Sequence, residues 1–406
     1  MLVVQKYGGS SVATVERIFN VARRIMKTKS EGHDVVVILS AQGDTTDNLL
    51  DLAKSVNKNA SKRELDMLLS TGEQQSIALM AMALQSLDVA ATSLNAWQIE
   101  METSNNHSNA RIVQMGTERI LNEIDRKNAV IIAGFQGVNK YYDITTLGRG
   151  GSDTTAVAVA AAINADLCEI YTDVDGVYTG DPRHIKNAQK LKEISYDEML
   201  ELASLGAQVL HNRSVEMAKK YNVNLCVRSS FSDLEGTVVK EEVNMEKMLV
   251  SGVAVDKNCA RITVAGMENI PGNAYNIFSS LSNERISVDI ILQSTDDKGK
   301  SNISFTVANE DLDNTLKVLE SKAHILGYST IESVTSLAKL SIVGAGMATN
   351  PGVASSFFEV LYEIGAKIDL ISTSEIKISV LVPADVVDVA ANEVHDRFFK
   401  NIRKFN

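Results

Sequence analysis

The sequence predicts an α/β sandwich with a largely parallel sheet, followed by two small βαββαβ units. Three observations predict this fold class. Apolar runs typical of buried strands alternate with helical stretches up to about residue 230. A charged stretch, residues 240–247, then marks a boundary, and beyond it one order of strands and helices occurs twice. At 406 residues the chain is also long enough for two or three domains.

The elements of the N-terminal region follow from apolar runs bounded by turn residues. Strands are predicted at residues 2–4, 35–40, 129–135, 168–176 and 225–231, and helices at about 12–29, 64–84, 110–126, 156–165 and 196–220. Ser10 or Ser11 is expected to cap the first helix. Sheets of this kind bind ligands at the carboxyl ends of their strands, so the loops there are the places to search.

The C-terminal region repeats itself. Pro271 and Pro351 each precede a glycine and lie 80 residues apart, and Asp289 and Asp369 have the same offset. The second copy has no convincing last strand, while an apolar run at 249–256 precedes the first copy. We therefore expect this run to complete the second unit, with the first unit inserted within it. The expected domains are residues 1–240, 260–337 and 338–406.

Composition excludes several classes of protein. The formal net charge of −11 argues against binding to nucleic acid or to an anionic membrane surface. No apolar run approaches the ~18 residues of a membrane span, and no secretory signal is visible. Three widely spaced cysteines, Cys168, Cys226 and Cys259, fit a reducing compartment and hence the cytoplasm.

Five polar motifs lie at predicted strand or helix ends. They are KYGGSS (6–11), SAQGDTTD (40–47), STGEQQS (70–76), TLGRGGSDTTA (146–156) and TDVDGVYTGDPR (172–183). Glycines expose backbone N–H groups, a helix N-terminus favours anions, and Lys6 and Arg149 add positive charge. Such groups suit a polyphosphate and a second anion. A phosphoryl-transfer site needs no nucleophilic side chain, because it works by positioning and charge neutralisation.

Each motif alone has an ordinary structural interpretation. A Gly-Gly pair after a strand is more often only a tight turn, and Glu73 alone would be an exposed helix residue. The acidic loop at 172–183 resembles a calcium loop but has neither the spacing nor the closing glutamate of one. The occurrence of all five motifs in one α/β half favours a shared site.

These motifs, together with GAQVLHNRSVEMA at 206–218, closely resemble the aspartate kinases. That family has an amino acid kinase fold followed by two regulatory ACT domains, and the resemblance covers essentially the whole chain. Asn212 is a departure, since the family often has proline there. The resemblance implies ATP-dependent phosphorylation of the β-carboxylate of L-aspartate to 4-phospho-L-aspartate, the first step of lysine, threonine and methionine synthesis. The aspartate side chain, with a pKa near ~3.9, is already an anionic nucleophile at neutral pH.

The resemblance also implies a role for individual motif residues. Lys6 would contact the transferring phosphoryl group, and Asp153 would organise Lys6 and the site. The nucleotide site would comprise Lys6, Tyr7, Gly8, Gly9, Ser40, Thr172, Asp173, Tyr178 and Arg183. The aspartate site would comprise Thr46, Glu73, Arg149, Gly150, Gly151 and Ser152, with Arg149 on a carboxylate and Glu73 on the ammonium. Mg²⁺ is expected to arrive with ATP, held mainly by phosphate oxygens rather than by a protein metal site.

For the repeats, the resemblance implies an amino-acid effector, lysine or threonine or both, and a homodimer paired through the ACT domains. The Pro-Gly loops before the helices offer N–H groups suited to an α-carboxylate. The expected effector residues are Asn269, Asn273, Ala274, Gln293, Asn350 and Val353. Asn273 or Asn350 alone would be an ordinary loop residue.

Two alternatives remain open at this level. One is a related carboxylate kinase acting on glutamate or acetylglutamate, although Glu73 argues against a substrate whose amine is capped. The other is a catalytically silent amino-acid sensor on the same scaffold, against which the intact set of Lys6, Arg149 and Asp153 argues.

Overall fold

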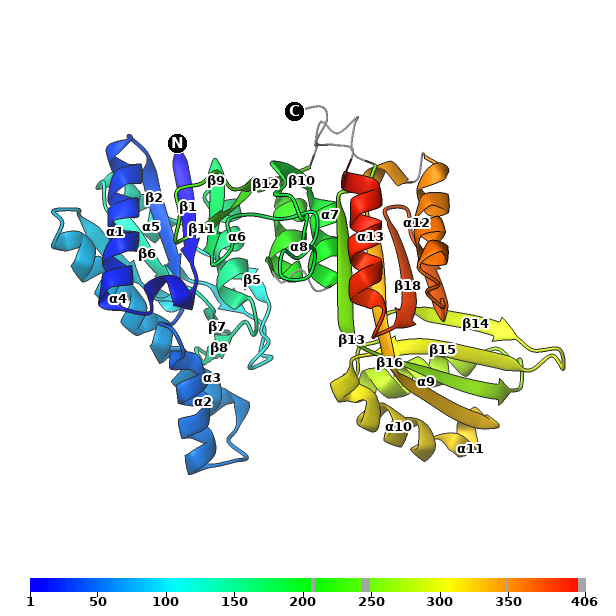
Figure 1. Ribbon diagram of the computed structural model, residues 1–406. Coiled ribbons are helices and arrows are strands. Elements are labelled where there is room, and N and C mark those ends of the chain that lie inside the picture. The colour runs from blue at the N-terminus through cyan, green and yellow to red at the C-terminus, as the bar shows by residue number, and fades with distance from the viewer. Residues whose placement is uncertain (206–208, 242–248, 348–349, 401–406) are drawn as a thin grey trace. The chain divides into compact units, whose positions relative to one another are not determined.

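We describe the protein from a computed structural model, which covers residues 1–205, 209–241, 249–347 and 350–400. The chain forms two compact units. One unit comprises residues 1–178 and 189–246, and the other comprises 179–188 and 247–406. Figure 1 shows the order of the elements along the chain.

A large, mostly parallel sheet forms the centre of the first unit. Its strand order is β10-β12-β11-β9-β1-β2-β6-β3. Adjacent strands are parallel along the series β11-β9-β1-β2-β6-β3, and β12 is antiparallel to β11. The strands are β1 (Leu2–Tyr7), β2 (Asp34–Leu39), β3 (Ala91–Leu94), β6 (Ala129–Ala133), β9 (Leu167–Thr172), β10 (Glu193–Ser195), β11 (Leu225–Ser229) and β12 (Thr237–Lys240). A smaller sheet contains β4 (Glu102–Thr103), β5 (Ile112–Gln114), β7 (Gln136–Asn139) and β8 (Ile144–Thr146).

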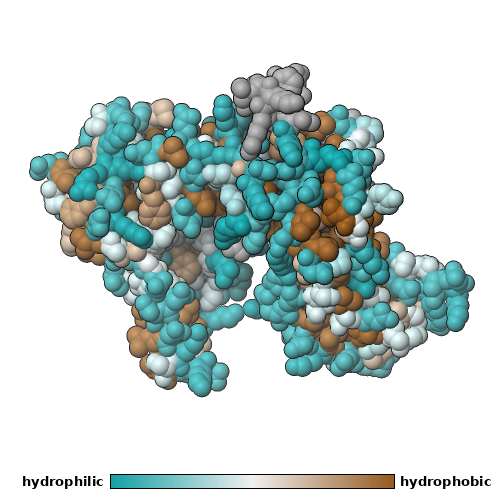
Figure 2. Space-filling model, in the orientation of Figure 1, coloured by the Kyte–Doolittle hydropathy of each residue, from teal (hydrophilic) through white to brown (hydrophobic). Residues whose placement is uncertain are grey.

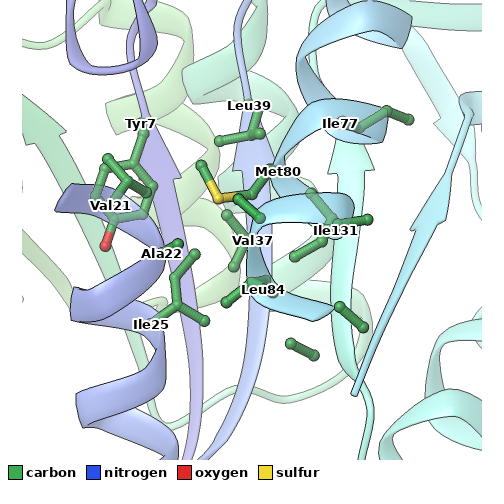
Figure 3. Packing of buried hydrophobic residues seen from close by; sticks show 14 of the residues in the cluster. Tyr7, Val21, Ala22, Ile25, Val37, Leu39, Ile77, Met80, Leu84 and Ile131 are labelled. Carbon is green, nitrogen blue, oxygen red and sulfur yellow. The ribbon is translucent and has the colours of Figure 1, made fainter. Parts of the chain in front are cut away.

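Helices cover both faces of the large sheet. On one face α1 and α4 share a core with β1, β2 and β6, which Figure 3 shows around Tyr7, Val37 and Met80. Each fully buried aliphatic side chain of this core contributes roughly 1.5–3 kcal/mol to stability. On the other face α6 packs against β1, β2 and β9. The helices are α1 (Val15–Ser30), α2 (Thr45–Val56), α3 (Lys62–Leu69), α4 (Thr71–Gln85), α5 (Glu118–Asp125), α6 (Gly151–Ala162), α7 (Tyr196–Ser204) and α8 (Asn212–Tyr221).

Several predicted helix limits were wrong. The first helix begins at Val15 and is capped by Thr14, whose hydroxyl accepts from Arg17 N, because Gly9–Val12 form a 3₁₀ turn instead. The stretch predicted as one helix at 64–84 is divided at Ser70 into α3 and α4. The helix predicted at 110–126 is only α5, since β5 occupies its first part. The helix predicted at 196–220 forms α7 and α8, and residues 206–208 between them lie outside the described residues.

The second unit is built on a six-stranded antiparallel sheet of order β14-β15-β13-β16-β18-β17. Helices α9 and α10 pack in one half of it, and α12 and α13 in the other (Figure 1). The strands are β13 (Gly252–Met267), β14 (Ile291–Thr295), β15 (Ser301–Val307), β16 (Thr330–Val343), β17 (Leu370–Thr373) and β18 (Lys377–Pro383). The helices are α9 (Asn273–Asn283), α10 (Leu312–Ser321), α11 (Ala323–Leu326), α12 (Gly352–Glu363) and α13 (Val387–Phe399). This mixed architecture confirms the predicted fold class.

The two repeats share the two long central strands. The first half of β13, from Gly252 to Asp256, pairs with Lys339–Val343 of β16, beside the second repeat. The second half of β13 pairs with β15 of the first repeat. The sequence pattern suggested two separate strands here, whereas one strand of 16 residues passes through both repeats. The charged stretch at 240–247 and the C-terminal residues 401–406, on which the expected boundaries partly depended, lie largely outside the described residues.

A symmetric pair of ion pairs joins the repeats. Asp289 of the first repeat contacts Lys339 on the first strand of the second repeat. Asp369, at the matching place in the second repeat, lies 3.2 Å from the Nε of Arg261 on the first strand of the first repeat. Asp289 and Asp369, which lie 80 residues apart in the sequence, therefore make equivalent contacts, each to the first strand of the other repeat.

The short segment Thr179–Ala188 packs with the second unit although it continues the acidic loop of the first. Thr179 Oγ1 lies 2.8 Å from Nε2 of His395 on α13, and Asn392 accepts from Lys186 N at 3.0 Å. Ile185 joins the hydrophobic core of the second repeat.

No helix in the described part of the chain is long and apolar enough to cross a bilayer. Figure 2 shows hydrophilic residues over much of the visible face, with apolar patches between them.

Candidate active site

Lys6 lies at the carboxyl end of the central strand β1, between β2 and β9. Side chains alternate along a strand, so Tyr7 enters the core on the α1 face while Lys6 points to the α6 face. The Nζ of Lys6 lies 2.6 Å from Oδ1 of Asp153, and the side chains are 12% and 13% exposed. Asp153 is in the first turn of α6, where the helix dipole also stabilises a carboxylate. The ammonium group is therefore held in place with hydrogen-bond donors to spare.

The two glycines after Tyr7 allow two loops to touch. A Cβ on Gly9 would lie 2.5 Å from the carbonyl oxygen of Ala41, and Gly43 N donates to Gly9 O at 3.0 Å. Only glycine fits this contact between the KYGGSS and SAQGDTTD motifs. A Cβ on Gly8 would lie 3.6 Å from the Nζ of Lys6, so this stretch of backbone lies directly beside the ammonium.

Glu73 is a buried carboxylate at the start of α4, only 3% exposed. Its Oε1 accepts from Ala41 N at 3.1 Å, which brings it to the loop that contacts Gly9. Its Oε2 has no hydrogen-bond partner among the described residues. Burial raises the pKa of Glu73 to about 7, against the opposing effect of the Ala41 N–H. A buried oxygen without a partner is costly, and a cationic ligand group would satisfy it.

The GRGGSD segment begins α6 with a left-handed turn. Gly150 has φ of +67°, and a Cβ there would lie 2.3 Å from the ring of His211. A Cβ on Gly134, after β6, would lie 2.7 Å from the hydroxyl of Ser152, so the ends of β6 and the start of α6 meet. The guanidinium of Arg149 is exposed and has no hydrogen bond or ion pair to the described residues. It is available to an external anion.

The predicted nucleotide residues of the first unit follow β2 and β9. Ser40 N donates to Tyr7 O at 3.2 Å, which places it beside the KYGG loop. Thr172 donates to the neighbouring carboxylate of Asp173 at 2.8 Å. Tyr178 donates to Asp175 at 2.9 Å, and burial raises the pKa of its hydroxyl. Because β2 and β9 both run parallel to β1, these residues follow strand ends at the same edge of the sheet as Lys6.

Two further predicted site residues, Arg183 and Thr46, have other surroundings. Arg183 belongs to the second unit, where its guanidinium lies 2.7 Å from Asp181 and its side chain is 79% exposed. Thr46 is half-buried in the first turn of α2. Its neighbour Thr45 lies 3.4 Å from the position of a Cβ on Gly72, next to Glu73, so Thr46 is at the periphery of the site.

The sequence interpretation missed residues that support this site. Arg213 on α8 donates to Leu147 O at 2.8 Å and to Ala110 O at 2.6 Å, holding the backbone that leads to Arg149. Asp66 is fully buried beneath the same backbone. The motif at 206–218 contains Arg213, but its spacing alone gave no partner. Asn212 is the first residue of α8, a position where proline is favoured, which explains the proline often found in the family.

The predicted effector residues lie at opposite ends of the second unit's sheet, because β13 and β16 are antiparallel and each leads into the Pro-Gly loop of its own repeat. In the first repeat Asn273 donates to Glu268 O, and in the second Asn350 donates to Gly346 O at 2.8 Å. The exposed Gln293 on β14 donates to Ser301 at 3.2 Å, and Ser301 pairs with Met267, next to the Pro-Gly loop. Of the remaining predicted residues, Asn269 is exposed, Ala274 is half-buried and Val353 is buried in the core.

Comparison with known proteins agrees with both units. Residues 1–229 match the amino acid kinase family, and residues 262–322 and 340–398 each match the ACT domain. The fold and the motifs thus define an amino acid kinase with ACT domains. An aspartokinase of Bacillus sp. MGA3 is 51% identical over 398 residues, covering 98% of this chain and 97% of that protein. Aspartokinase 2 of Bacillus subtilis is 49% identical over the same length, again with 98% and 97% covered.

Solved structures give the same family. Aspartokinase III of E. coli in complex with aspartate and ADP has a TM-score of 0.83 at 25% identity, covering 98% of this chain and 100% of that chain. The same enzyme in complex with lysine and aspartate has a TM-score of 0.77, also at 25% identity, covering 98% and 99%. The chain belongs to the aspartokinases, within the amino acid kinase family.

Proposed function

We propose that this chain transfers the γ-phosphoryl group of ATP to the β-carboxylate of L-aspartate. The observation that carries the proposal is the buried Glu73 carboxylate, which has one oxygen without a partner among the described residues and lies beside the loop that packs on Gly9. A free α-ammonium group fits this oxygen, whereas an N-acetylated substrate has no cation to offer. The complex of E. coli aspartokinase III with aspartate and ADP supports the same substrates here.

The proposed mechanism needs no general base. The β-carboxylate is ionised at neutral pH and attacks the γ-phosphorus, while the bond to the β,γ-bridging oxygen breaks and ADP leaves. The main obstacle is repulsion between two anions. Lys6, held by Asp153, would neutralise charge on the transferring group, and the N–H groups of Gly8 and Gly9 would contact the phosphates.

The remaining predicted residues divide between two subsites. Arg149 would form a paired hydrogen bond with a carboxylate of aspartate, with Gly150, Gly151, Ser152 and Thr46 around it. Tyr7, Ser40, Thr172, Asp173 and Tyr178 would line the nucleotide, and Arg183 is the remaining residue of the predicted nucleotide site. The described residues contain no group of three or more His, Cys, Asp or Glu arranged for a metal. Mg²⁺ would be held mainly by the phosphates of ATP, where it would neutralise their charge.

A panel of acceptors tests the proposal. ADP release is measured by a coupled assay with L-aspartate, L-glutamate or N-acetylglutamate as acceptor. Turnover with aspartate, and little with the other two, is expected. Preference for glutamate or N-acetylglutamate would contradict the assignment of Glu73 and the substrate, and no turnover with any acceptor would favour an amino-acid sensor.

The raised pKa of Glu73 predicts a pH dependence of aspartate binding. The ammonium binds the carboxylate form, which is lost as the pH falls through about 7. The KM for aspartate should therefore rise about tenfold between about pH 8 and pH 6, while the KM for ATP changes little. Steady-state kinetics across this range provide the measurement. In Glu73→Gln the KM should already be high at pH 8 and nearly flat, and an unchanged pH profile in this variant would remove Glu73 as the titrating group.

We further propose regulation through the second unit, with lysine, threonine or both as feedback inhibitors. The complex of E. coli aspartokinase III with lysine supports this class of effector. The exposed edge strand β14, on which Ile291 and Leu292 are 49% and 48% exposed, suits pairing of two chains through their ACT domains. An effector inhibits only if it binds the less active arrangement more tightly.

Replacing Gln293 tests the effector site. Its exposed amide lies at the same end of the sheet as the Pro-Gly loop of the first repeat. Gln293→Ala is expected to weaken inhibition by lysine or threonine and to leave the uninhibited kcat close to normal. Assays with each amino acid, alone and together at millimolar levels, are the measurement. Absence of both inhibition and calorimetric binding in the unaltered protein would contradict the regulatory proposal and leave the kinase proposal intact.

A further inference from the structure

Asp66 on α3 is a fully buried carboxylate that accepts hydrogen bonds from the end of strand β8 and from the loop at residues 107–108. Its Oδ1 and Oδ2 accept from Thr146 Oγ1 and N at 2.8 and 2.9 Å. They also accept from Ser108 N at 2.9 Å and Ser108 Oγ at 3.3 Å, and Nδ1 of His107 lies 3.1 Å away. A buried carboxylate with this many donors fixes the groups around it, because each donor would otherwise be left without an acceptor.

The groups that Asp66 holds lead directly to Arg149. Thr146 ends β8, three residues before Arg149. Ala110 N donates to Thr146 O at 2.9 Å, so the loop containing Ser108 runs beside the same strand. Gly148, with φ of +80°, lies against this loop, since a Cβ there would be 3.0 Å from Ser108 O. The backbone before Arg149 is thus supported by Asp66 from one helix and by Arg213 from another.

The same helical segment carries Glu73. Asp66 O accepts from Ser70 N at 3.1 Å, and α4 begins at the next residue, with Glu73 in its first turn. Gln136 donates to Ser70 O at 3.1 Å, which fixes this junction against β7. Asp66 is therefore linked to Glu73 through the short stretch 67–72, and to Arg149 through Thr146.

We propose that Asp66 is a positioning residue that sets the separation between Arg149 and Glu73, the groups assigned to a carboxylate and to the ammonium of aspartate. The proposal rests on the proposed function, because it concerns the same substrate. Asp66 acts through backbone and touches neither substrate nor nucleotide. Loss of Asp66 should therefore weaken binding of aspartate, which must contact both charged groups at once. Binding of ATP depends on the loops at Lys6 and Thr172 and should be nearly unchanged.

Two substitutions of Asp66 separate positioning by hydrogen bonds from a need for charge. Asp66→Ala removes all the acceptors, and the KM for aspartate should rise about tenfold or more, since small misplacement of a binding group is costly. Asp66→Asn keeps one carbonyl oxygen for the N–H donors of Thr146 and Ser108, and their hydroxyls can turn to accept from its amide. We expect its aspartate KM to remain within about threefold of normal. The KM for ATP should change less than about twofold in both.

Matched variants control for a loss of stability. Glu123 is another carboxylate, 3% exposed and hydrogen-bonded to Asn128 and Thr92 in the same unit, away from the site. Glu123→Ala should lower the Tm without changing the ratio of the two KM values. If Asp66→Ala does not fold, Thr146→Val removes one donor to Asp66 with little change in shape, and it should still raise the aspartate KM.

The outcomes distinguish this proposal from the proposed function. A rise in aspartate KM in Asp66→Ala, recovery in Asp66→Asn and no change in Glu123→Ala support it. Equal rises for aspartate and ATP, equal effects of Ala and Asn, or no change in folded Asp66→Ala and Thr146→Val would overturn it. If the unaltered protein does not use aspartate, or Arg149→Lys has no effect on the aspartate KM, the proposed function fails instead.

Discussion

In Lys6→Ala, kcat is expected to fall about 100-fold or more, the usual scale for losing one fixed charge-stabilising group. The Nζ of Lys6 lies 2.6 Å from Asp153 and next to the backbone of Gly8, at the carboxyl end of the central strand. No other lysine in the described part of the chain pairs with Asp153, so no neighbour takes its place. The fold should survive, because the hydrophobic core on the opposite face of β1 is built from Tyr7 and its neighbours.

The measurement is kcat in a coupled ADP-release assay, with thermal unfolding to confirm the fold. Lys54→Ala is the matched control, since the side chain of Lys54 is 68% exposed on α2 and pairs only with Asp51 there. It should leave kcat unchanged. A well-folded Lys6→Ala protein with near-normal kcat would remove Lys6 from the mechanism.

Arg149→Lys is expected to raise the KM for aspartate about tenfold or more, because lysine keeps the charge but loses the planar pair of donors that matches a carboxylate. The exposed guanidinium has no hydrogen bond or ion pair among the described residues, so the change disturbs no internal contact there. The KM for ATP should change far less. Steady-state kinetics with each substrate varied in turn provide the measurement.

A control for this variant is Arg126→Lys. Arg126 directly follows α5, and its side chain is 71% exposed. It should leave both KM values unchanged. If Arg149→Lys weakens ATP alone, the assignment of the two subsites is reversed. If both KM values rise equally, Arg149 does not separate the two substrates.

The alternation of apolar runs and helices was sufficient to predict the parallel sheet, because buried strands and glycine-rich loops have strong local signals. The glycine contacts explain why KYGGSS and SAQGDTTD come together: Gly9 leaves room for Ala41 O. The helix limits failed where local signals were ambiguous. Ser10 and Ser11 are good caps by type, yet the chain first makes a 3₁₀ turn and Thr14 caps the helix.

The supporting residues of the site could not be predicted, because their partners are distant in sequence. Asp66 lies 80 residues from Thr146, and Arg213 lies 66 residues from Leu147. Each would be interpreted from sequence as a surface charge on a helix. The sequence also did not show how deeply two predicted site residues are buried. Glu73 is 3% exposed, whereas the side chain of Arg183 is 79% exposed and belongs to the second unit. Contacts formed only by the tertiary fold decide these cases.

Trapping of the product with hydroxylamine tests the central claim most directly. An acyl phosphate reacts with hydroxylamine to give a hydroxamate and release phosphate, whereas a phosphate ester does not. With ATP, Mg²⁺ and L-aspartate, the protein is predicted to form aspartyl hydroxamate in step with ADP, and Lys6→Ala to form very little. ADP release without hydroxamate, or hydroxamate formed from glutamate but not from aspartate, would contradict phosphorylation of the aspartate β-carboxylate.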